Sequence, residues 1–173
     1  GAATLMLLAW GLFDGLIIAP PDYQQGETVR IMYVHVPSAY MSMFIFGSMA
    51  FASAIALIWR HPLADIAAKA SALIGAGMTA TALDTGMLWG QPMWGTFWVW
   101  DARLTSMLLL FFIYLGYIAL WAANDDPERA GRAAAILALV GSVNLPIIHF
   151  SVEWWNTLHQ GPSVLVPGGS TIE

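Results

Sequence analysis

This chain has no cysteine and few charges. Without a cysteine among its 173 residues, the sequence offers no disulfide, thiolate nucleophile, iron–sulfur ligand or cysteine-type zinc site. Charged residues make up only 10% of the chain, against roughly 25% in ordinary soluble domains. This scarcity excludes a disordered chain, a basic patch for nucleic acid and most soluble enzymes.

Apolar residues dominate instead, at 58% of the sequence with a mean hydropathy of +0.66. A soluble core of this size could not bury so much apolar side chain. A transmembrane helix needs about 20 mostly apolar residues, and we assign five such stretches at residues 2–19, 39–59, 66–88, 102–123 and 132–150. We therefore predict an all-α, polytopic membrane helix bundle, a single domain over residues 1–173. Asp101 and Asp126 should cap the fourth and fifth helices.

The few basic residues predict the orientation of this bundle, because cytoplasmic loops are enriched in Lys and Arg. Four of the six basic residues fall in or beside loops 60–69 and 124–132, namely Arg60, Lys69, Arg129 and Arg132. We therefore place these two loops in the cytoplasm. Segments 20–38, 89–101 and 151–173 then share the outer face, where they should form a common site.

Tryptophans concentrate on this predicted outer face. A simple aromatic belt would decorate both membrane interfaces, so we favour a flat aromatic platform for a planar ligand. Gly90, Pro92 and Gly95 predict that helix is interrupted in this region, leaving an interfacial shelf of short helix and turn. The outer tryptophans are Trp89, Trp94, Trp98, Trp100, Trp154 and Trp155.

Two histidines flank the tryptophan shelf. His35 precedes the second predicted helix, where Pro37 should hold Val36 extended, and His159 follows the fifth. Either alone would be an ordinary interfacial histidine. Together they indicate a haem site, because imidazole binds iron well and haem takes one ligand on each face. Two loops can supply those ligands from opposite sides.

The remaining polar residues of the outer face have two interpretations each. Arg30 and Arg103 could clamp haem propionates through bidentate pairing with carboxylate, or could form local ion pairs, with Asp101–Arg103 as the obvious candidate. Asp101 could also orient the shelf. We expect His149 to bond backbone groups that Pro146 leaves free.

Three separated motifs carry a resemblance to a known family. Residues 94–105, Trp-Gly-Thr-Phe-Trp-Val-Trp-Asp-Ala-Arg-Leu-Thr, resemble the "WWD" signature of haem-handling membrane proteins. Residues 33–37 (Tyr-Val-His-Val-Pro) and the run 144–161 around Trp154, Trp155 and His159 extend the match over nearly the whole chain. The sequence therefore resembles the haem exporter protein C family of bacterial cytochrome c maturation.

The resemblance implies a multi-pass protein of the bacterial inner membrane that holds non-covalent haem b at the periplasmic face. The WWD segment would be the platform, and His35 and His159 the axial ligands. The implied partners are a membrane-anchored chaperone that binds haem covalently, a small single-span subunit and an ABC-type transporter. No enzymatic step is implied. Since the family has six helices, we expect this chain to be a fragment.

Three alternatives remain open at this point. A membrane b-type cytochrome would carry electrons, although its histidines usually lie inside helices. The larger cytochrome c synthetases share the tryptophan signature but have further spans and a partner domain. A haem-free transporter or scaffold is the third. The sequence assigns no role to Asp14 or Asp84.

Overall fold

Helices account for most of residues 1–159, the part of the chain that the computed structural model describes. They are α1 (Ala2–Phe13), α2 (Met32–Trp59), α3 (Pro62–Trp94), α4 (Ala102–Ala123), α5 (Pro127–Gly141) and α6 (Asn144–Trp154). A π-helical turn, η1 (Asp14–Ile18), extends α1, and a 3-10 turn, η2 (Glu27–Ile31), leads directly into α2. The predicted all-α polytopic membrane bundle is confirmed.

Within residues 1–159, four helical segments are long and apolar enough to cross a membrane: Glu27–Trp59, Pro62–Trp94, Ala102–Ala123 and Pro127–Trp154. The first predicted stretch forms only a shorter apolar helix, Ala2–Ile18. Of the five predicted stretches, the last four therefore correspond to segments of membrane-spanning length, and the first corresponds to a shorter helix.

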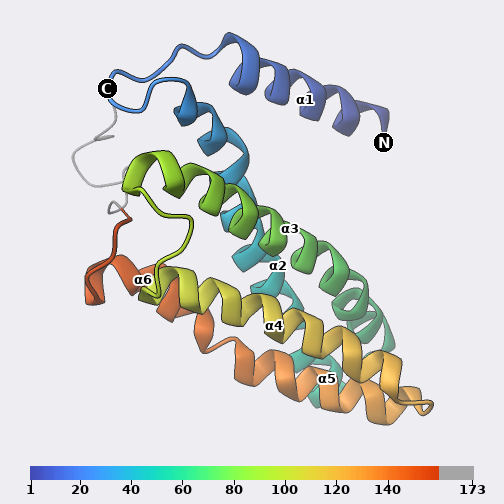
Figure 1. Ribbon diagram of the computed structural model, residues 1–173. Coiled ribbons are helices and arrows are strands. Elements are labelled where there is room, and N and C mark those ends of the chain that lie inside the picture. The colour runs from blue at the N-terminus through green and yellow to red at the C-terminus, as the bar shows by residue number, and fades with distance from the viewer. Residues whose placement is uncertain (160–173) are drawn as a thin grey trace.

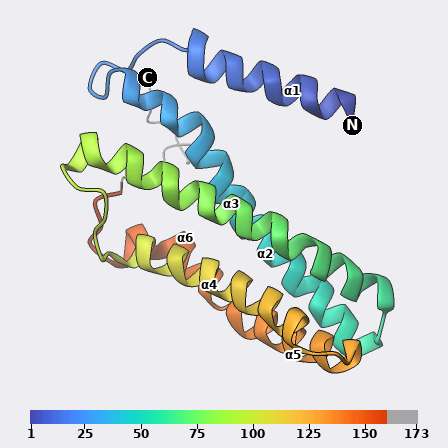
Figure 2. The same cartoon turned by 45° about the vertical axis from the view of Figure 1, so that its right-hand side comes forward.

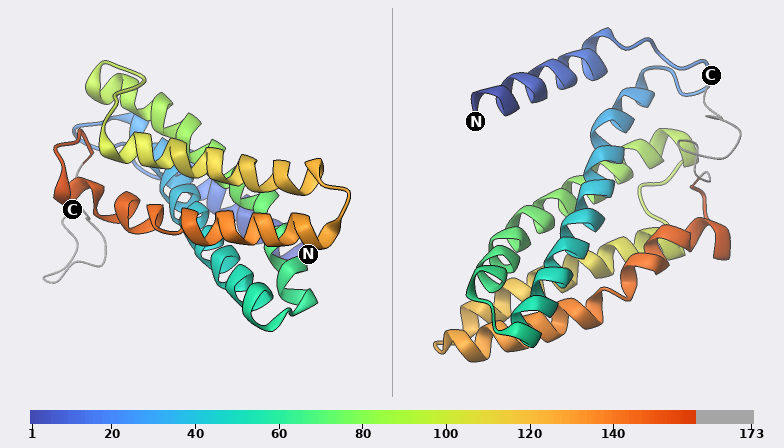
Figure 3. Two further views of the ribbon diagram at one scale, coloured as in Figure 1. Left: turned by 90° about the horizontal axis from the view of Figure 1, so that it is seen from below. Right: turned by 180° about the vertical axis from the view of Figure 1, so that it is seen from behind.

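The bundle consists of two antiparallel hairpins. Helices α2 and α3 form one, α4 and α5 form the other, and they pack together through α3 against α4 and α2 against α5, while α6 continues along α4. Helix α1 lies apart, with α2 and α3 between it and the second hairpin (Figures 1, 2 and 3). No residue of α1 is buried.

An aromatic pair on facing helices holds the two hairpins together. Tyr114 and Phe46 are fully buried and meet edge to face, with ring centroids 5.0 Å apart. The hydroxyl of Tyr114 donates to the carbonyl oxygen of Ser42 at 2.9 Å, which satisfies the phenol inside an apolar core. Gly75 makes room for this ring, because a Cβ there would collide with it.

The connections alternate between the two ends of the bundle. The segment from η1 to α2, the α3–α4 connection and the segment after α6 lie at one end, whereas the α2–α3 and α4–α5 turns lie at the other (Figure 1). Segments 20–38 and 89–101 and residues 151–159 therefore lie at the same end, as predicted, whereas residues 160–173 of the third predicted segment lie outside the described part of the chain.

Helix α2 begins earlier than the sequence suggests, and the prediction of an extended Val36 is wrong. His35 and Val36 are both helical, and Pro37 lies inside α2. The Ser38 hydroxyl donates to the carbonyl oxygen of Val34 at 2.7 Å, so this carbonyl gains a partner beside the proline. The extended preference before proline is a bias, and packing of α2 along α3 overrides it.

Helix α3 also continues further than predicted. It passes through Gly90 and Pro92 to Trp94, and only Gly95 ends it, with φ +76 and its N–H donating to Gln91 O at 2.9 Å. Glycine tolerates this left-handed conformation without a Cβ penalty. The tryptophan shelf is therefore the last turn of α3 followed by an irregular segment at 95–101.

Both predicted N-caps are confirmed. The Asp101 carboxylate accepts from the backbone N–H of Leu104 at 2.7 Å, and Asp126 accepts from that of Glu128 at 3.0 Å. These bonds satisfy amides that have no partner within the first helical turn. Asp101 thereby sets where α4 begins, next to the predicted site.

The last predicted stretch, residues 132–150, is divided between α5 and α6. The break falls at residues 142–143, and Pro146 then lies in the first turn of α6, where a missing N–H costs little. Buried Asn144 donates from Nδ2 to Ser106 O at 2.8 Å. This bond fixes the start of α6 against α4.

Candidate functional site

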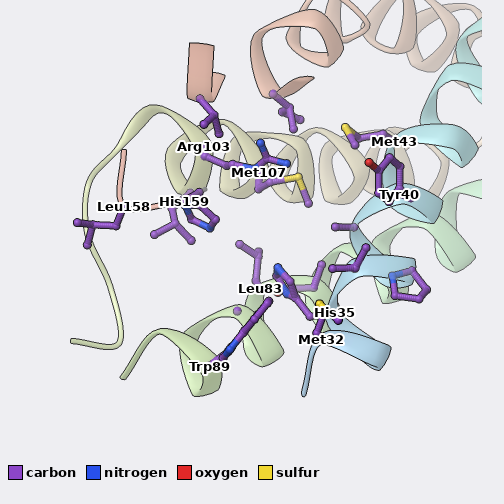
Figure 4. Close-up of a pocket in the computed structure, with 18 of the residues that line it drawn as sticks. Met32, His35, Tyr40, Met43, Leu83, Trp89, Arg103, Met107, Leu158 and His159 are labelled. Carbon is purple, nitrogen blue, oxygen red and sulfur yellow. Dashed lines mark hydrogen bonds between the residues drawn. The ribbon is translucent and has the colours of Figure 1, made fainter. Parts of the chain in front are cut away.

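A cavity of about 450 Å³ opens at the end of the bundle that carries the α3–α4 connection. Helices α2, α3, α4 and α6 surround it, and the segment after α6 adds Leu158 and His159. Its size lies within the range of cofactor and ligand pockets. His35 and Trp89 border it on one side, and His159 and Arg103 on the other (Figure 4).

His35 is held by one edge of its ring. Its Nδ1 lies 2.9 Å from Ala82 O and 3.1 Å from Thr85 Oγ1, both on α3. Because a carbonyl oxygen only accepts, Nδ1 is the donor, and Nε2 of the neutral ring keeps its lone pair. Gly86 leaves space for the ring, since a Cβ there would lie 2.9 Å from His35 Cε1.

His159 faces a carboxylate with the same edge of its ring, without a hydrogen bond as short as those of His35. Its Nδ1 lies 3.4 Å from Oδ2 of Asp101, and both side chains are largely buried. Burial lowers the pKa of His159, the positive charge of Arg103 lowers it further, and Asp101 opposes both. The ring is therefore neutral near pH 7. With Nδ1 facing the carboxylate, Nε2 is available to a ligand, as for carboxylate-oriented histidines in metal sites.

Two tryptophans of α3 pack against the two imidazoles. Trp89 meets His35 edge to face with ring centroids 5.7 Å apart, and Trp94 meets His159 at 4.8 Å. The indole N–H of Trp89 donates to Gln25 Oε1 at 2.9 Å, which ties the end of α3 to the turn before α2. The last turns of α3 thus orient both histidines.

Of the two predicted arginines, only one lines the cavity. Arg103 borders it, with no ion pair to any residue in the range 1–159. Arg30 pairs with Glu27 at 3.0 Å and donates to carbonyl oxygens at the end of η1, Leu16 O at 3.0 Å and Ala19 O at 3.1 Å. Arg30 thus joins η1 to η2 away from the cavity.

The other predicted tryptophans do not line the cavity. Trp98 and Trp100 pack on each other with centroids 5.3 Å apart, in the segment between α3 and α4. Trp154 stacks on Phe150 at 5.1 Å and touches Trp155, at the end of α6. The structure brings together His35, His159, Trp89, Trp94 and Arg103 around one space, with Asp101 behind His159.

Several residues that line the cavity were not predicted from the sequence. Met32, Tyr40 and Met43 line the cavity from the same face of α2 as His35, and Met93 and Met107 line it from α3 and α4. Apolar and aromatic residues recur at helical spacing through positions 32, 36, 39, 40 and 43, on the same face as His35. Assigning the segment before Pro37 to a loop concealed this repeat.

The fold and this cavity define a multi-pass membrane protein with an aromatic, two-histidine site at one end of its helix bundle. A family model described as "Heme exporter protein C" matches residues 1–173. The chain belongs to the haem exporter protein C family.

Individual relatives support this assignment. The chain is 64% identical over 172 residues to "Heme exporter protein C" of Bradyrhizobium diazoefficiens, covering 99% of this chain and 65% of the relative. It is 60% identical over 159 residues to the protein of that name from Escherichia coli K12, covering 92% and 65%. The Haemophilus influenzae protein is 57% identical over 161 residues, covering 93% and 65%. The chain thus spans about two thirds of each relative.

Proposed function

We propose that this protein binds haem b non-covalently in the outer-end cavity, holds it at the periplasmic face of the bacterial inner membrane and passes it on for cytochrome c biogenesis. The observation that carries the proposal is the pair of imidazoles: His35 and His159 line one cavity, with Nδ1 of His35 hydrogen-bonded to Ala82 O and Nδ1 of His159 facing Asp101 at 3.4 Å.

Two imidazoles suit an iron that already has four ligands. Residues 1–159 contain no group of three or more His, Asp or Glu side chains gathered to hold a metal ion. A porphyrin supplies four equatorial nitrogens, so its iron needs only two axial ligands from the protein. His35 and His159 would supply these ligands through Nε2.

The remaining cavity residues match the other parts of a haem. Trp89 and Trp94 offer apolar surface and stacking for a porphyrin face, and methionines of three helices fill irregular space with polarizable side chains. Arg103 would pair with a propionate, because guanidinium binds carboxylate in a bidentate manner. These residues bind and orient haem, and none is required to make or break a bond.

A carrier must release what it binds. His159 lies on the irregular segment after α6, whereas His35 lies within helix α2. Displacing that segment would remove one axial ligand while leaving the other in place. We assign the acceptor to a membrane-anchored chaperone that binds haem covalently, assisted by a single-span subunit and an ABC-type transporter.

A membrane b-type cytochrome is the second candidate, and one observation favours it. His35 lies inside a helix, where electron-carrying cytochromes hold their ligands. His159 and the location of the cavity at the end of the bundle favour transfer instead. Redox titration with quinol separates the two, because a carrier exchanges electrons with it, whereas a transfer protein loses haem to an acceptor.

The decisive experiment replaces both ligands. We expect the double variant His35→Ala, His159→Ala to lose the absorption and electron paramagnetic resonance signals of six-coordinate haem. His61→Ala is the matched control, since His61 is exposed at the opposite end of the bundle, before α3. Retention of a full six-coordinate spectrum by the double variant would refute the axial assignment.

A further inference from the structure

A second groove adjoins the cavity on the side of the bundle. Residues of α2 and α6 line it: Tyr40, Met43, Phe44, Leu145, Pro146, His149 and Phe150. Three of them, Tyr40, Met43 and His149, also line the main cavity. The groove and the cavity are therefore adjacent along these shared residues, with no helix between them.

The packing of the helices explains this groove. Helix α6 packs against α4, while α2 packs against α3 and α5, so α2 and α6 diverge toward the outer end. Both helices belong to membrane-length segments. Phe44 is 69% exposed and lines the groove but not the main cavity, so we expect its ring to face lipid tails.

His149 is the unusual member of this lining. Its ring is exposed, packs edge to face on Phe150 with centroids 4.7 Å apart, and forms no hydrogen bond with any residue of the range 1–159. The predicted bond to backbone groups near Pro146 is thus not among its contacts. A polar side chain in a membrane segment is costly, which makes it a functional candidate.

We propose that the gap between α2 and α6 is a lateral port through which haem moves between the bilayer and the cavity, with His149 as a transient iron ligand in the port. The inference rests on the proposed function. Haem is a planar apolar molecule with two carboxylates, so it partitions into a bilayer leaflet, and an aromatic groove with one imidazole matches its chemistry. Arg103 and the two axial histidines lie beyond the port.

A cysteine introduced in the port tests this route, since the described chain has none of its own. Phe44→Cys is placed in the full-length protein in nanodiscs and then modified with a bulky lipid-soluble maleimide. Uptake of haem from phosphatidylcholine vesicles is followed through the Soret band before and after modification. We expect modification to slow uptake at least tenfold.

Phe51→Cys is the matched control. Phe51 lies two turns further along α2, has the same 69% exposure as Phe44 and does not line the groove. Its modification should change the uptake rate less than twofold. Equal uptake rates before and after modification at position 44 would overturn the port. That result would show that whatever else occupies the groove, haem does not pass through it.

His149→Phe tests the transient ligand. We expect uptake to slow about tenfold while the final six-coordinate spectrum stays unchanged, because His35 and His159 still supply both axial ligands. An unchanged rate would remove His149 from the route. Failure of the proposed function looks different: the unmodified protein would then take up no six-coordinate haem at all.

Discussion

The absence of a side chain at Gly86 leaves the space that the His35 ring occupies. The ring lies against Gly86 and is held on its Nδ1 edge by Ala82 and Thr85. Each of these partners lies on α3, within four residues of Gly86. The ligand on α2 is therefore oriented by its neighbour helix, and a small change on α3 should alter the ligand without touching it.

We expect Gly86→Ala to reduce the six-coordinate fraction of bound haem at least twofold, because its Cβ would lie 2.9 Å from His35 Cε1 and push the ring from its hydrogen bonds. Electron paramagnetic resonance measures this fraction. Gly77→Ala on the same helix meets nothing within 4 Å. The control should keep the spectrum and raise stability by about 0.5–1 kcal/mol through helix propensity. Identical spectra for the two variants would contradict this role of Gly86.

At the scale of elements, the break between α5 and α6 determines the shape of the site. It directs α6 along α4 and away from α2, which leaves the groove and brings Ile148 and His149 to the cavity. The amide of Asn144 secures this direction through Ser106 O. Buried hydrogen bonds of this kind contribute about 1 kcal/mol each.

Asn144→Ala should therefore destabilise the protein by about 1–2 kcal/mol and speed amide exchange in α6. Unfolding in mixed micelles gives the first quantity, and hydrogen–deuterium exchange gives the second. Asn124→Ala provides the control, because Asn124 makes the same type of bond, to Leu120 O at 2.7 Å, at an exposed site. A loss of stability equal in the two variants would contradict the anchoring of α6 by Asn144.

At the scale of the whole molecule, the distribution of charge should decide which end faces the cytoplasm. Arg60, Arg129 and Arg132 lie at or near the end opposite the cavity. Loops enriched in Arg and Lys stay in the cytoplasm, so the cavity should face the periplasm.

Cysteine labelling in spheroplasts tests this orientation. We expect Tyr23→Cys, at a residue that is 89% exposed beside the cavity end, to react with a membrane-impermeant maleimide in intact spheroplasts. Asp125→Cys, in the α4–α5 turn, should react only after permeabilisation. The reverse pattern would show that the charge rule assigns the wrong face.

Local sequence patterns predicted much of this architecture, but they did not predict that His35 and Trp94 lie within helices. Asp101 and Asp126 were assigned as caps from sequence, since a cap depends on the amides of its own first turn. The helix limits near Pro37 and Pro92 were misplaced, because a proline's local preference competes with packing against another helix. Only the structure shows that packing prevailed at both prolines.

Composition and pattern by themselves determined that this chain is an all-α membrane protein and that the segments carrying His35, Trp89 and His159 meet at one end. Those properties follow from the lengths of the apolar stretches and from the fact that successive connections lie at alternate ends of a helix bundle. Both can be read along the sequence without knowing any contact between helices. The tertiary structure alone decided that Arg103 and not Arg30 reaches the cavity, that Trp89 and Trp94 line it, and that α2 and α6 diverge beside His149. These choices depend on contacts between helices distant in sequence, and no local pattern encodes them.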